Sequence, residues 1–346
     1  MRVLLTGHQG YLGTVMVPVL DAARHDVVGL DSGLFADCVL GPTPKDPPGM
    51  QVDLRDVTAG QLTGFDAVIH LAALSNDPLG SLAPQITYDI NLNASTRLAV
   101  LARDAGVRRF LYASTCSVYG AAGGDKLVAE NAPLRPVTPY AETKVRFEDE
   151  LFALADGDFC PVSLRNATAF GFSPRLRADV VLNNLVGHAM LSGRVRVLSD
   201  GTPWRPLAHV TDIAVAFAAA LVAPREAVHA RAFNVGSEAN NVTVKQIADA
   251  VAGTVPGSVL AITGETGPDP RSYRVDFSAV RAALTGFRTC RSIEDGAREL
   301  YDAYRAHGLT RETFERRFTR LTRLTDRQAA GELTQAMRAP ASSTPV

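Results

Sequence analysis

The chain has 346 residues, of which 46% are hydrophobic and 21% charged, and its 35 basic and 36 acidic side chains nearly cancel. This balance is typical of a soluble globular protein with one large or two medium domains, and it offers no basic excess for binding nucleic acid. No apolar run reaches the roughly 18 to 20 residues that cross a bilayer, so no membrane partner is expected.

The N-terminal run Arg2–Leu5 leads directly into a glycine-containing turn, without the apolar stretch and cleavage site of a signal peptide. We therefore expect a cytoplasmic protein. The four cysteines are widely spaced, with no CxxC pair, which predicts free thiols rather than a zinc site or a disulfide framework. No metal is expected. These cysteines are Cys38, Cys116, Cys160 and Cys290.

Short apolar runs alternate with longer amphipathic stretches through the first half of the chain, a pattern typical of βα units on a parallel sheet. The predicted strands are 2–5, 27–30, 67–71, 110–113 and 162–165, and the predicted helices lie at about 11–24, 85–105 and 139–155. Beyond about residue 170, predicted helices at about 178–192, 211–223 and 243–253 mix with strands at 195–198, 232–235 and 259–262. The pattern predicts an α/β fold, a Rossmann-type doubly wound parallel sheet with a smaller C-terminal α/β substrate lobe.

The first predicted strand runs into three glycines and then into an apolar helix. Glycines at this spacing let the backbone turn tightly and approach a pyrophosphate, with the helix N-terminus toward the phosphates. A purely structural βα turn is the alternative. We expect a dinucleotide to contact this turn through Gly7, Gln9, Gly10, Tyr11, Leu12 and Gly13.

The second predicted strand leads to Asp31, about eighteen residues beyond the last of these glycines. A carboxylate there binds the ribose hydroxyls of NAD and repels the 2′-phosphate of NADP. Ser32 and Gly33 follow, with no arginine that would favour NADP. The expected cofactor is therefore NAD.

These features predict three regions. Residues 1–170 form an NAD-binding Rossmann domain, to which later segments at about 205–236 return. Residues 171–308 are mainly a substrate-binding lobe. Residues 309–346 are expected to be a surface helical extension with solvated charges, followed by a disordered tail from Ala339 to Val346.

Tyr140 and Lys144 lie four residues apart, so they share one face of the helix that Pro139 begins. A nearby ammonium favours the phenolate and lowers the pKa of a tyrosine, which makes the phenol a usable general acid and base. An ordinary helix surface is the alternative. Upstream, the strand end Ser114-Thr115-Cys116-Ser117 offers a hydroxyl that could share a substrate proton with Tyr140.

Together these motifs resemble the extended short-chain dehydrogenase/reductases, specifically their nucleotide-sugar epimerase/dehydratase group, over about residues 1–305. The resemblance implies that Thr115, Tyr140 and Lys144 are catalytic. It further implies a homodimer formed through the helices near 85–105 and 139–155. Beyond the glycine turn and Asp31, the residues expected to contact or support the cofactor site are Ser32, Asp53, Leu54, Leu71, Ala72, Ala73, Asn91, Tyr140 and Lys144.

The two residues after Thr115 separate reactions within the group. The 4,6-dehydratases carry Asp-Glu there, because elimination of water needs an extra acid and base; this chain has Cys116 and Ser117. GDP-L-fucose synthase and its relatives place a catalytic cysteine at the position of Ser117. UDP-galactose 4-epimerases, with small or neutral residues at both positions, are the closest match. Cys116 is expected as a buried thiol, with a catalytic role as the alternative.

The second half resembles the family's nucleotide-diphosphate site. Asn183-Asn184-Leu185 is similar to the epimerase Asn-Asn-Leu, and Arg205 matches an arginine that grips phosphate. Two positions depart from the family. Thr168 replaces a common asparagine, and Thr266 replaces the arginine three residues before Asp269, so that Arg271 would supply the charge. The expected substrate contacts are Ser75, Cys116, Ser117, Thr168, Asn183, Asn184, Leu185, Arg205 and Arg271.

The resemblance thus implies an NAD-dependent epimerase that oxidises a nucleotide-diphosphate sugar, most simply at C4, and returns hydride to the opposite face. A nucleotide-sugar 4-ketoreductase or dehydrogenase is the second hypothesis. A non-catalytic NAD-binding regulator is the third, and the presence of Thr115, Tyr140 and Lys144 disfavours it.

Overall fold

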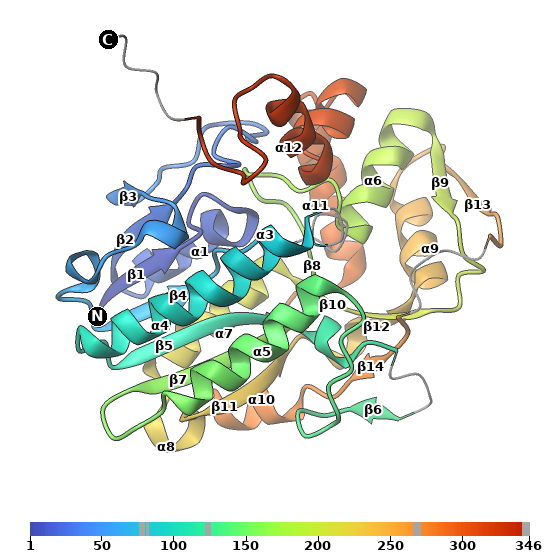
Figure 1. Ribbon diagram of the computed structural model, residues 1–346. Coiled ribbons are helices and arrows are strands. Elements are labelled where there is room, and N and C mark those ends of the chain that lie inside the picture. Colours follow the sequence, from blue (N-terminus) through green and yellow to red (C-terminus); the bar gives the residue numbers. More distant parts are fainter. Residues whose placement is uncertain (76–79, 81–82, 122–125, 266–270, 341–346) are drawn as a thin grey trace, which may run out of the picture.

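The computed structural model describes residues 1–75, 80, 83–121, 126–265 and 271–340, and its centre is a sheet of seven parallel strands (Figure 1). The expected doubly wound parallel sheet is confirmed. From one edge to the other the strands are β11 (Arg231–Val235), β7 (Cys160–Asn166), β5 (Arg109–Thr115), β4 (Ala67–His70), β1 (Arg2–Thr6), β2 (Asp26–Asp31) and β3 (Gly49–Gln51).

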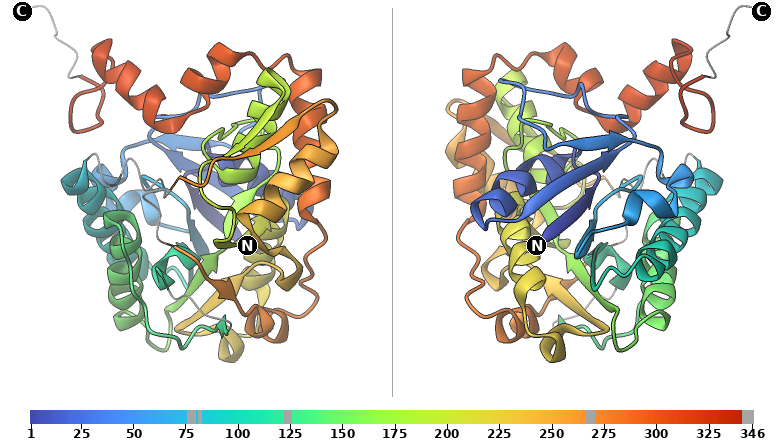
Figure 2. Two further views of the ribbon diagram at one scale, coloured as in Figure 1. Left: turned by 90° about the vertical axis from the view of Figure 1, so that its right-hand side faces the viewer. Right: turned by 90° about the vertical axis from the view of Figure 1, so that its left-hand side faces the viewer.

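Helices cover both faces of this sheet (Figures 1 and 2). On one face, α1 (Tyr11–Ala22) packs against α7 (Val210–Val222), and on the other α4 (Ser95–Asp104) packs against α5 (Pro139–Ala153). The strands are apolar on both sides because each side faces a helical layer. Separate buried clusters result, with Met16 and Phe217 in one and Leu98 and Phe147 in the other.

The helix predicted at 85–105 is interrupted. Its first part is α3 (Pro84–Tyr88), its last part is α4, and between them the backbone makes a wider π-helical turn over Asp89–Ala94. Such turns are common at functional sites. Within this turn the Asn91 amide accepts a hydrogen bond from the Leu74 N–H at 2.8 Å and donates one to the Leu74 carbonyl at 3.1 Å. The turn therefore fixes the loop that follows β4.

A second lobe packs over the carboxyl end of the sheet around its own buried cluster. Its helices are α6 (Val181–Ser192), α9 (Val244–Thr254) and α11 (Ile293–Ala306). The pairing strands are β9 (Arg194–Val197) with β13 (Val259–Ile262), then β8 (Thr168–Phe170), β10 (Trp204–His209) and β12 (Asn241–Thr243), with β6 (Leu127–Val128) and β14 (Arg274–Val275) as a separate pair.

The sequence patterns did not identify α11, although Ser292 and Asp295 form a reciprocal cap at its start. Strands of two or three residues were also missed because they are too short to show a period. Smaller elements are the helices α8 (Arg225–Val228) and α10 (Ser278–Ala283) and the 3₁₀ turns Leu54–Asp56, Ala59–Leu62, Cys116–Tyr119 and Glu238–Asn240.

The apolar side chains of the expected C-terminal helical extension pack into the protein. Phe314, in the π-helical turn Thr313–Arg317, and Phe318 are buried in the second-lobe cluster. Leu324, on α12 (Arg320–Ala329), is buried with Leu333 and Met337 in a small cluster of its own. The tail beyond residue 340 lies outside the described residues.

Within the described ranges, no helix combines the length and apolarity that a membrane span would need. The four cysteines are unpaired, as expected, and Cys290 alone among them is exposed.

Candidate active site

A cavity of about 1000 Å³ opens at the carboxyl ends of the central strands and extends beneath the second lobe. Ligands of open parallel sheets bind at this end. Most of the residues singled out from the sequence line it: Gly7, Gln9, Gly10, Tyr11, Leu12, Gly13, Asp31, Ser32, Asp53, Leu54, Leu71, Ala72, Ala73, Ser75, Thr115, Ser117, Tyr140, Lys144, Thr168, Asn184, Leu185, Arg205 and Arg271.

The glycine turn holds β1, the loop after β4 and α1 in close contact. Gly7 has a φ of +76°, and a side chain there would meet the Ala72 nitrogen at 2.8 Å. A side chain at Gly13 would lie 2.2 Å from the Gly7 carbonyl oxygen. The N-cap of α1 is Gly10, which supplies no side-chain cap to the first N–H groups. Those groups are therefore available to an anion.

Asp31 lies at the end of β2, beside this turn. Its carboxylate accepts hydrogen bonds from the Gln9 N–H at 3.0 Å and from the Gly33 N–H at 2.8 Å. These bonds fix the orientation of the carboxylate but use only part of its accepting capacity. A bare helix N-terminus with an oriented carboxylate beside it fits the pyrophosphate and ribose of NAD.

The carboxylate of Asp53 makes more hydrogen bonds within the protein than that of Asp31. It caps the following 3₁₀ turn and accepts hydrogen bonds from the Arg55 backbone N–H and from Nε and Nη2 of the same residue, at 2.6 to 2.9 Å. Burial opposes ionisation of Asp53, but the hydrogen bonds and charge of Arg55 outweigh it and lower the pKa of the carboxyl. Its side chain therefore shapes the cavity wall as a fixed anion.

Tyr140 and Lys144 enter the cavity from the first turns of α5. This helix starts where predicted, with the Thr138 hydroxyl accepting a hydrogen bond from the Ala141 N–H and proline at the first position. The Lys144 ammonium lies 5.6 Å from the centre of the Tyr140 ring and donates a 2.8 Å hydrogen bond to the Ala113 carbonyl. Lys144 is only 2% exposed, and this burial lowers its pKa to about 7.

Hydroxyl groups at the end of β5 share this wall. The Thr115 oxygen accepts a hydrogen bond from the Ser117 N–H at 3.1 Å, and Thr115 lines the cavity. Its own proton therefore stays available for donation. Ser114 also lines the cavity, and its hydroxyl has no hydrogen-bond partner among the described residues.

Three of the candidate residues lie behind the cavity wall rather than in it. Asn91 binds Leu74, as described above. Cys116 is buried against the β7 backbone, where its thiol donates to the Arg165 carbonyl at 3.1 Å, and burial raises its pKa. Asn183 accepts a hydrogen bond from the Gly171 N–H and donates to Tyr11 and Arg177. Of these three, Asn183 differs from the expectation of direct ligand contact, whereas Asn91 supports the loop beside the site and Cys116 is a buried thiol.

Arg205 and Arg271 come together although they are distant in sequence. The Arg205 guanidinium donates to the Arg271 carbonyl, and the Arg271 guanidinium donates to the Ser117 hydroxyl at 3.3 Å. Both side chains line the cavity on the second-lobe side. Of the other departures noted in the sequence, Thr266 and Asp269 lie outside the described residues.

The charged residues of the cavity wall that were not singled out from the sequence include Arg177, Asp179 and Arg320. Arg177 forms a two-point ion pair with Asp179 and donates to the Ser75 hydroxyl at 3.2 Å. Arg320, from α12, is the third. No periodic pattern marks the first two. Arg320 lies four residues before the buried Leu324, and this helical spacing was the available signal that it faces inward.

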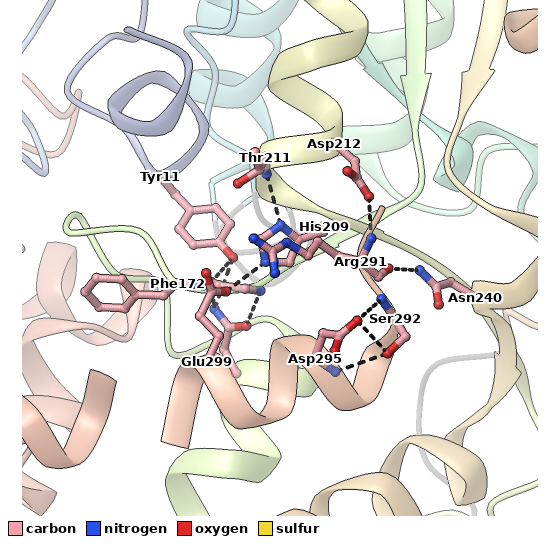
Figure 3. A network of polar contacts seen from close by, with 12 residues as sticks. Tyr11, Phe172, His209, Thr211, Asp212, Asn240, Arg291, Ser292, Asp295 and Glu299 are labelled. Carbon is pink, nitrogen blue, oxygen red and sulfur yellow. Dashed lines mark hydrogen bonds and ion pairs between the residues drawn. The ribbon is translucent and has the colours of Figure 1, made fainter. Parts of the chain in front are cut away.

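A polar network ties the second lobe to the glycine turn (Figure 3). Glu299, on α11, pairs with the His209 ring at 2.8 Å and accepts from the Phe172 N–H at 3.0 Å. The Tyr11 hydroxyl donates to the Gly171 carbonyl at 2.6 Å. A side chain at Gly171 would lie 2.3 Å from the His209 ring. The network fixes the distance between the two sides of the cavity.

Comparison with known proteins agrees with this arrangement. The sequence model of the NAD dependent epimerase/dehydratase family matches residues 3–236. The UDP-glucose 4-epimerase of Mycolicibacterium smegmatis is 30% identical over 74% of this chain and 83% of its own length. Among solved structures, MoeE5 in complex with UDP-glucuronic acid and NAD is 27% identical, with a TM-score of 0.76 over 88% of this chain and 99% of that one.

A second solved structure is the UDP-glucose 4-epimerase of Stenotrophomonas maltophila with bound NAD and formylated UDP-arabinopyranose. It is 27% identical, with a TM-score of 0.77, and the match covers 89% of this chain and 99% of that one. Both solved relatives were therefore captured with NAD and a UDP-sugar.

Proposed function

The chain belongs to the NAD-dependent epimerase/dehydratase family and uses NAD, and on this premise we propose that it epimerises a nucleotide-diphosphate sugar at C4. The single observation that carries the proposal is that Thr115, Tyr140 and Lys144 line the same cavity as the glycine turn and the Arg205–Arg271 pair. This is the arrangement that an alcohol oxidation on a diphosphate-anchored sugar requires.

Bound NAD would supply the hydride acceptor, and afterwards the hydride donor, for the sugar carbon. The chain positions this chemistry with the bare N-terminus of α1 for phosphate and with Asp31 for ribose hydroxyls. Lys144 adds a further donor near the sheet end, where its stem is buried and its Nζ is already oriented by the Ala113 carbonyl.

Proton transfer is assigned to Tyr140 and Thr115. Tyr140 as phenolate removes the proton from the sugar hydroxyl, and the Lys144 ammonium favours that phenolate. The Thr115 hydroxyl donates to the same sugar oxygen and keeps it in line with the phenol. When the carbonyl is reduced again, Tyr140 returns the proton, so the residues end the cycle in their starting state.

The Arg205–Arg271 pair supplies the diphosphate anchor, since guanidinium groups bind phosphate through two parallel hydrogen bonds. Asn184 and Leu185 lie on the same wall, and Ser75, Ser117 and Thr168 are near enough to the cavity to contact the sugar. The keto-sugar turns about this anchor between the two half-reactions. Dehydration is not supported, because Cys116 points its thiol into the protein and Ser117 is no acid.

The relatives direct the test to UDP-sugars. Purified protein incubated with UDP-glucose or UDP-galactose, without added reductant, is expected to interconvert them, as followed by NMR or chromatography. The Tyr140→Phe variant should lose about 10²-fold or more of this rate. Tyr301→Phe, at a half-buried tyrosine of α11 that does not line the cavity, is the matched control and should keep it.

A strict requirement for stoichiometric reduced cofactor would instead identify a 4-ketoreductase. Full activity of Tyr140→Phe would remove Tyr140 from the mechanism.

From the resemblance to the epimerase/dehydratase family we also expect a cytoplasmic homodimer that associates through α4 and α5. The mass of the protein in solution tests the oligomeric state.

A further inference from the structure

The segment 309–338, called here the C-terminal arm, wraps from the second lobe to the cofactor side of the cavity. Its start is attached to the second lobe, where the Ala178 N–H donates to the Phe318 carbonyl at 2.9 Å. Its middle binds the loop after Asp31: Arg323 pairs with Asp37 at 2.5 Å and Arg327 donates to the Leu34 carbonyl at 2.8 Å.

The end of the arm reaches the other side of the same site. The Ala336 carbonyl accepts a hydrogen bond from Arg55 at 3.0 Å, and Arg338 pairs with Asp56. Met337 itself lines the cavity. The arm therefore bridges the two segments, 32–38 and 53–56, that adjoin the cofactor residues Asp31 and Asp53.

Arg320 is the charged residue that the arm places in the cavity wall, and among the described residues no anion is paired with it. It is only 3% exposed, and Nη1 and Nη2 have no hydrogen-bond partner among the described residues. The guanidinium lies 4.1 Å from the centre of the Phe35 ring, which holds it in place by stacking. A buried guanidinium without acceptors is strongly unfavourable unless an anion binds it.

The groups around Arg320 do not provide that anion. Asp179, the carboxylate that acts electrostatically on Arg320, is already bound at two points by Arg177. The adjoining Cys38 thiol stays neutral, since burial raises its pKa. Among the described residues, two guanidinium groups therefore face one carboxylate, so the positive charges outnumber the negative ones at this place.

The position of Arg320 identifies the expected anion. Phe35, on which it stacks, lies four residues after Asp31, and the Arg177–Asp179 pair is linked through Asn183 to Tyr11, the first residue of α1. All of these groups except Asn183 line the cavity. Arg320 thus lines the same cavity as the bare helix N-terminus, beside the loop that follows Asp31, whereas Arg205 and Arg271 line it from the second lobe.

We propose that Arg320 binds the pyrophosphate of NAD and that the C-terminal arm is a clamp that retains the cofactor. The arm would supply the guanidinium opposite the N–H groups of α1, so that the pyrophosphate is held from two sides. This inference rests on NAD binding and not on C4 chemistry, so it can fail while the proposed epimerisation stands.

The test measures binding to protein freed of cofactor. NAD, adenosine and UDP are titrated separately into the wild type and into Arg320→Met, which keeps a stem on Phe35 but removes the charge. Arg316→Met is the matched control, because Arg316 is an exposed arginine of the same arm, paired with Asp326. Arg320→Lys tests whether a point charge suffices. Thermal unfolding of each cofactor-free variant is followed in parallel.

In Arg320→Met the Kd for NAD should rise about tenfold to a hundredfold, while those for adenosine and UDP stay within about twofold. Arg320→Lys should lie between this variant and the wild type, and Arg316→Met should match the wild type. The cofactor-free Arg320→Met protein should be as stable as the wild type or more stable, because an unpaired buried charge is gone.

Three results would overturn the proposal. An unchanged Kd for NAD means that Arg320 does not bind the cofactor. If Arg320→Met weakens the binding of adenosine as much as that of NAD, Arg320 supports the site through packing and does not bind the pyrophosphate. If Arg320→Met weakens the binding of UDP but not that of NAD, Arg320 binds the substrate diphosphate instead.

Discussion

At Lys144, burial disfavours the charged ammonium that the proposed mechanism uses. Its pKa lies near 7 in the folded, cofactor-free protein, because burial disfavours the ammonium more than the nearby Glu148 favours it. In the unfolded chain a lysine titrates near 10.4, roughly. Between these two values the unfolded state binds more protons than the folded state, so stability rises with pH across this window.

We predict that cofactor-free wild type gains stability relative to Lys144→Met as pH increases from 7 toward 10. Below pH 7 both states are protonated, the full cost of the buried ammonium is present, and the difference should be flat. Denaturant unfolding of both proteins at a series of pH values measures this difference. A difference that does not change between pH 7 and 9.5 would show that Lys144 is not desolvated.

Single residues also show where sequence reasoning stops. The motif Asn183-Asn184 placed an amide at the cavity correctly for Asn184, but Asn183 turns inward to Tyr11 and Gly171. Adjacent helical residues point about 100° apart, so a motif alone does not say which of the two faces the ligand. Arg271 is different, since its proposed partnership with Arg205 depends on a contact 66 residues away.

At the level of elements, the glycine turn can be tested through its packing. A methyl group at Gly13 would lie 2.2 Å from the Gly7 carbonyl oxygen and 2.6 Å from the His8 Cα. Gly13→Ala should therefore displace α1 from β1, lower the stability and weaken NAD binding by more than tenfold, roughly. Gly60→Ala has nothing within 4 Å of the added carbon and serves as the control. Normal NAD binding in Gly13→Ala would contradict this packing.

Helix α5 is anchored to the sheet by a buried ion pair. Glu148 binds Arg165 on β7 at 2.6 Å and accepts a hydrogen bond from the Ser163 hydroxyl at 2.8 Å. Removing one partner leaves the other charge buried and unpaired, so Glu148→Ala should lose about 3–5 kcal/mol of unfolding free energy. Glu150→Ala, two residues further on the exposed face, should change it by less than about 0.5 kcal/mol. If denaturant unfolding shows that Glu148→Ala changes the unfolding free energy as little as Glu150→Ala does, the anchoring role is refuted.

Long elements with clear end signals could be predicted, and interrupted or short ones could not. Thr138-Pro139 marked the start of α5 correctly, since both act within one turn. The π-helical turn Asp89–Ala94 depends on the contact between Asn91 and Leu74, which lies outside the local pattern. The short strands of the second lobe likewise form only because partners from other segments pair with them.

At the scale of the whole molecule, the parallel sheet and most of the cavity wall follow from the sequence, while the course of the C-terminal arm does not. The arm's bonds to Asp37 and Asp56 join residues about 280 positions apart, and no local pattern encodes such contacts. Its arginines indicated solvated charge because composition does not distinguish a side chain in water from one bound to a loop carbonyl.

The proposed chemistry is tested most directly by isotope transfer. UDP-glucose carrying deuterium at C4 is incubated with the enzyme in ordinary water, and the UDP-galactose formed is analysed by NMR and mass spectrometry. If the sugar is oxidised and reduced at one carbon within a single active-site visit, the product is inverted at C4 and keeps the deuterium there. Loss of the deuterium to solvent, or no inversion at C4, would contradict the proposed function.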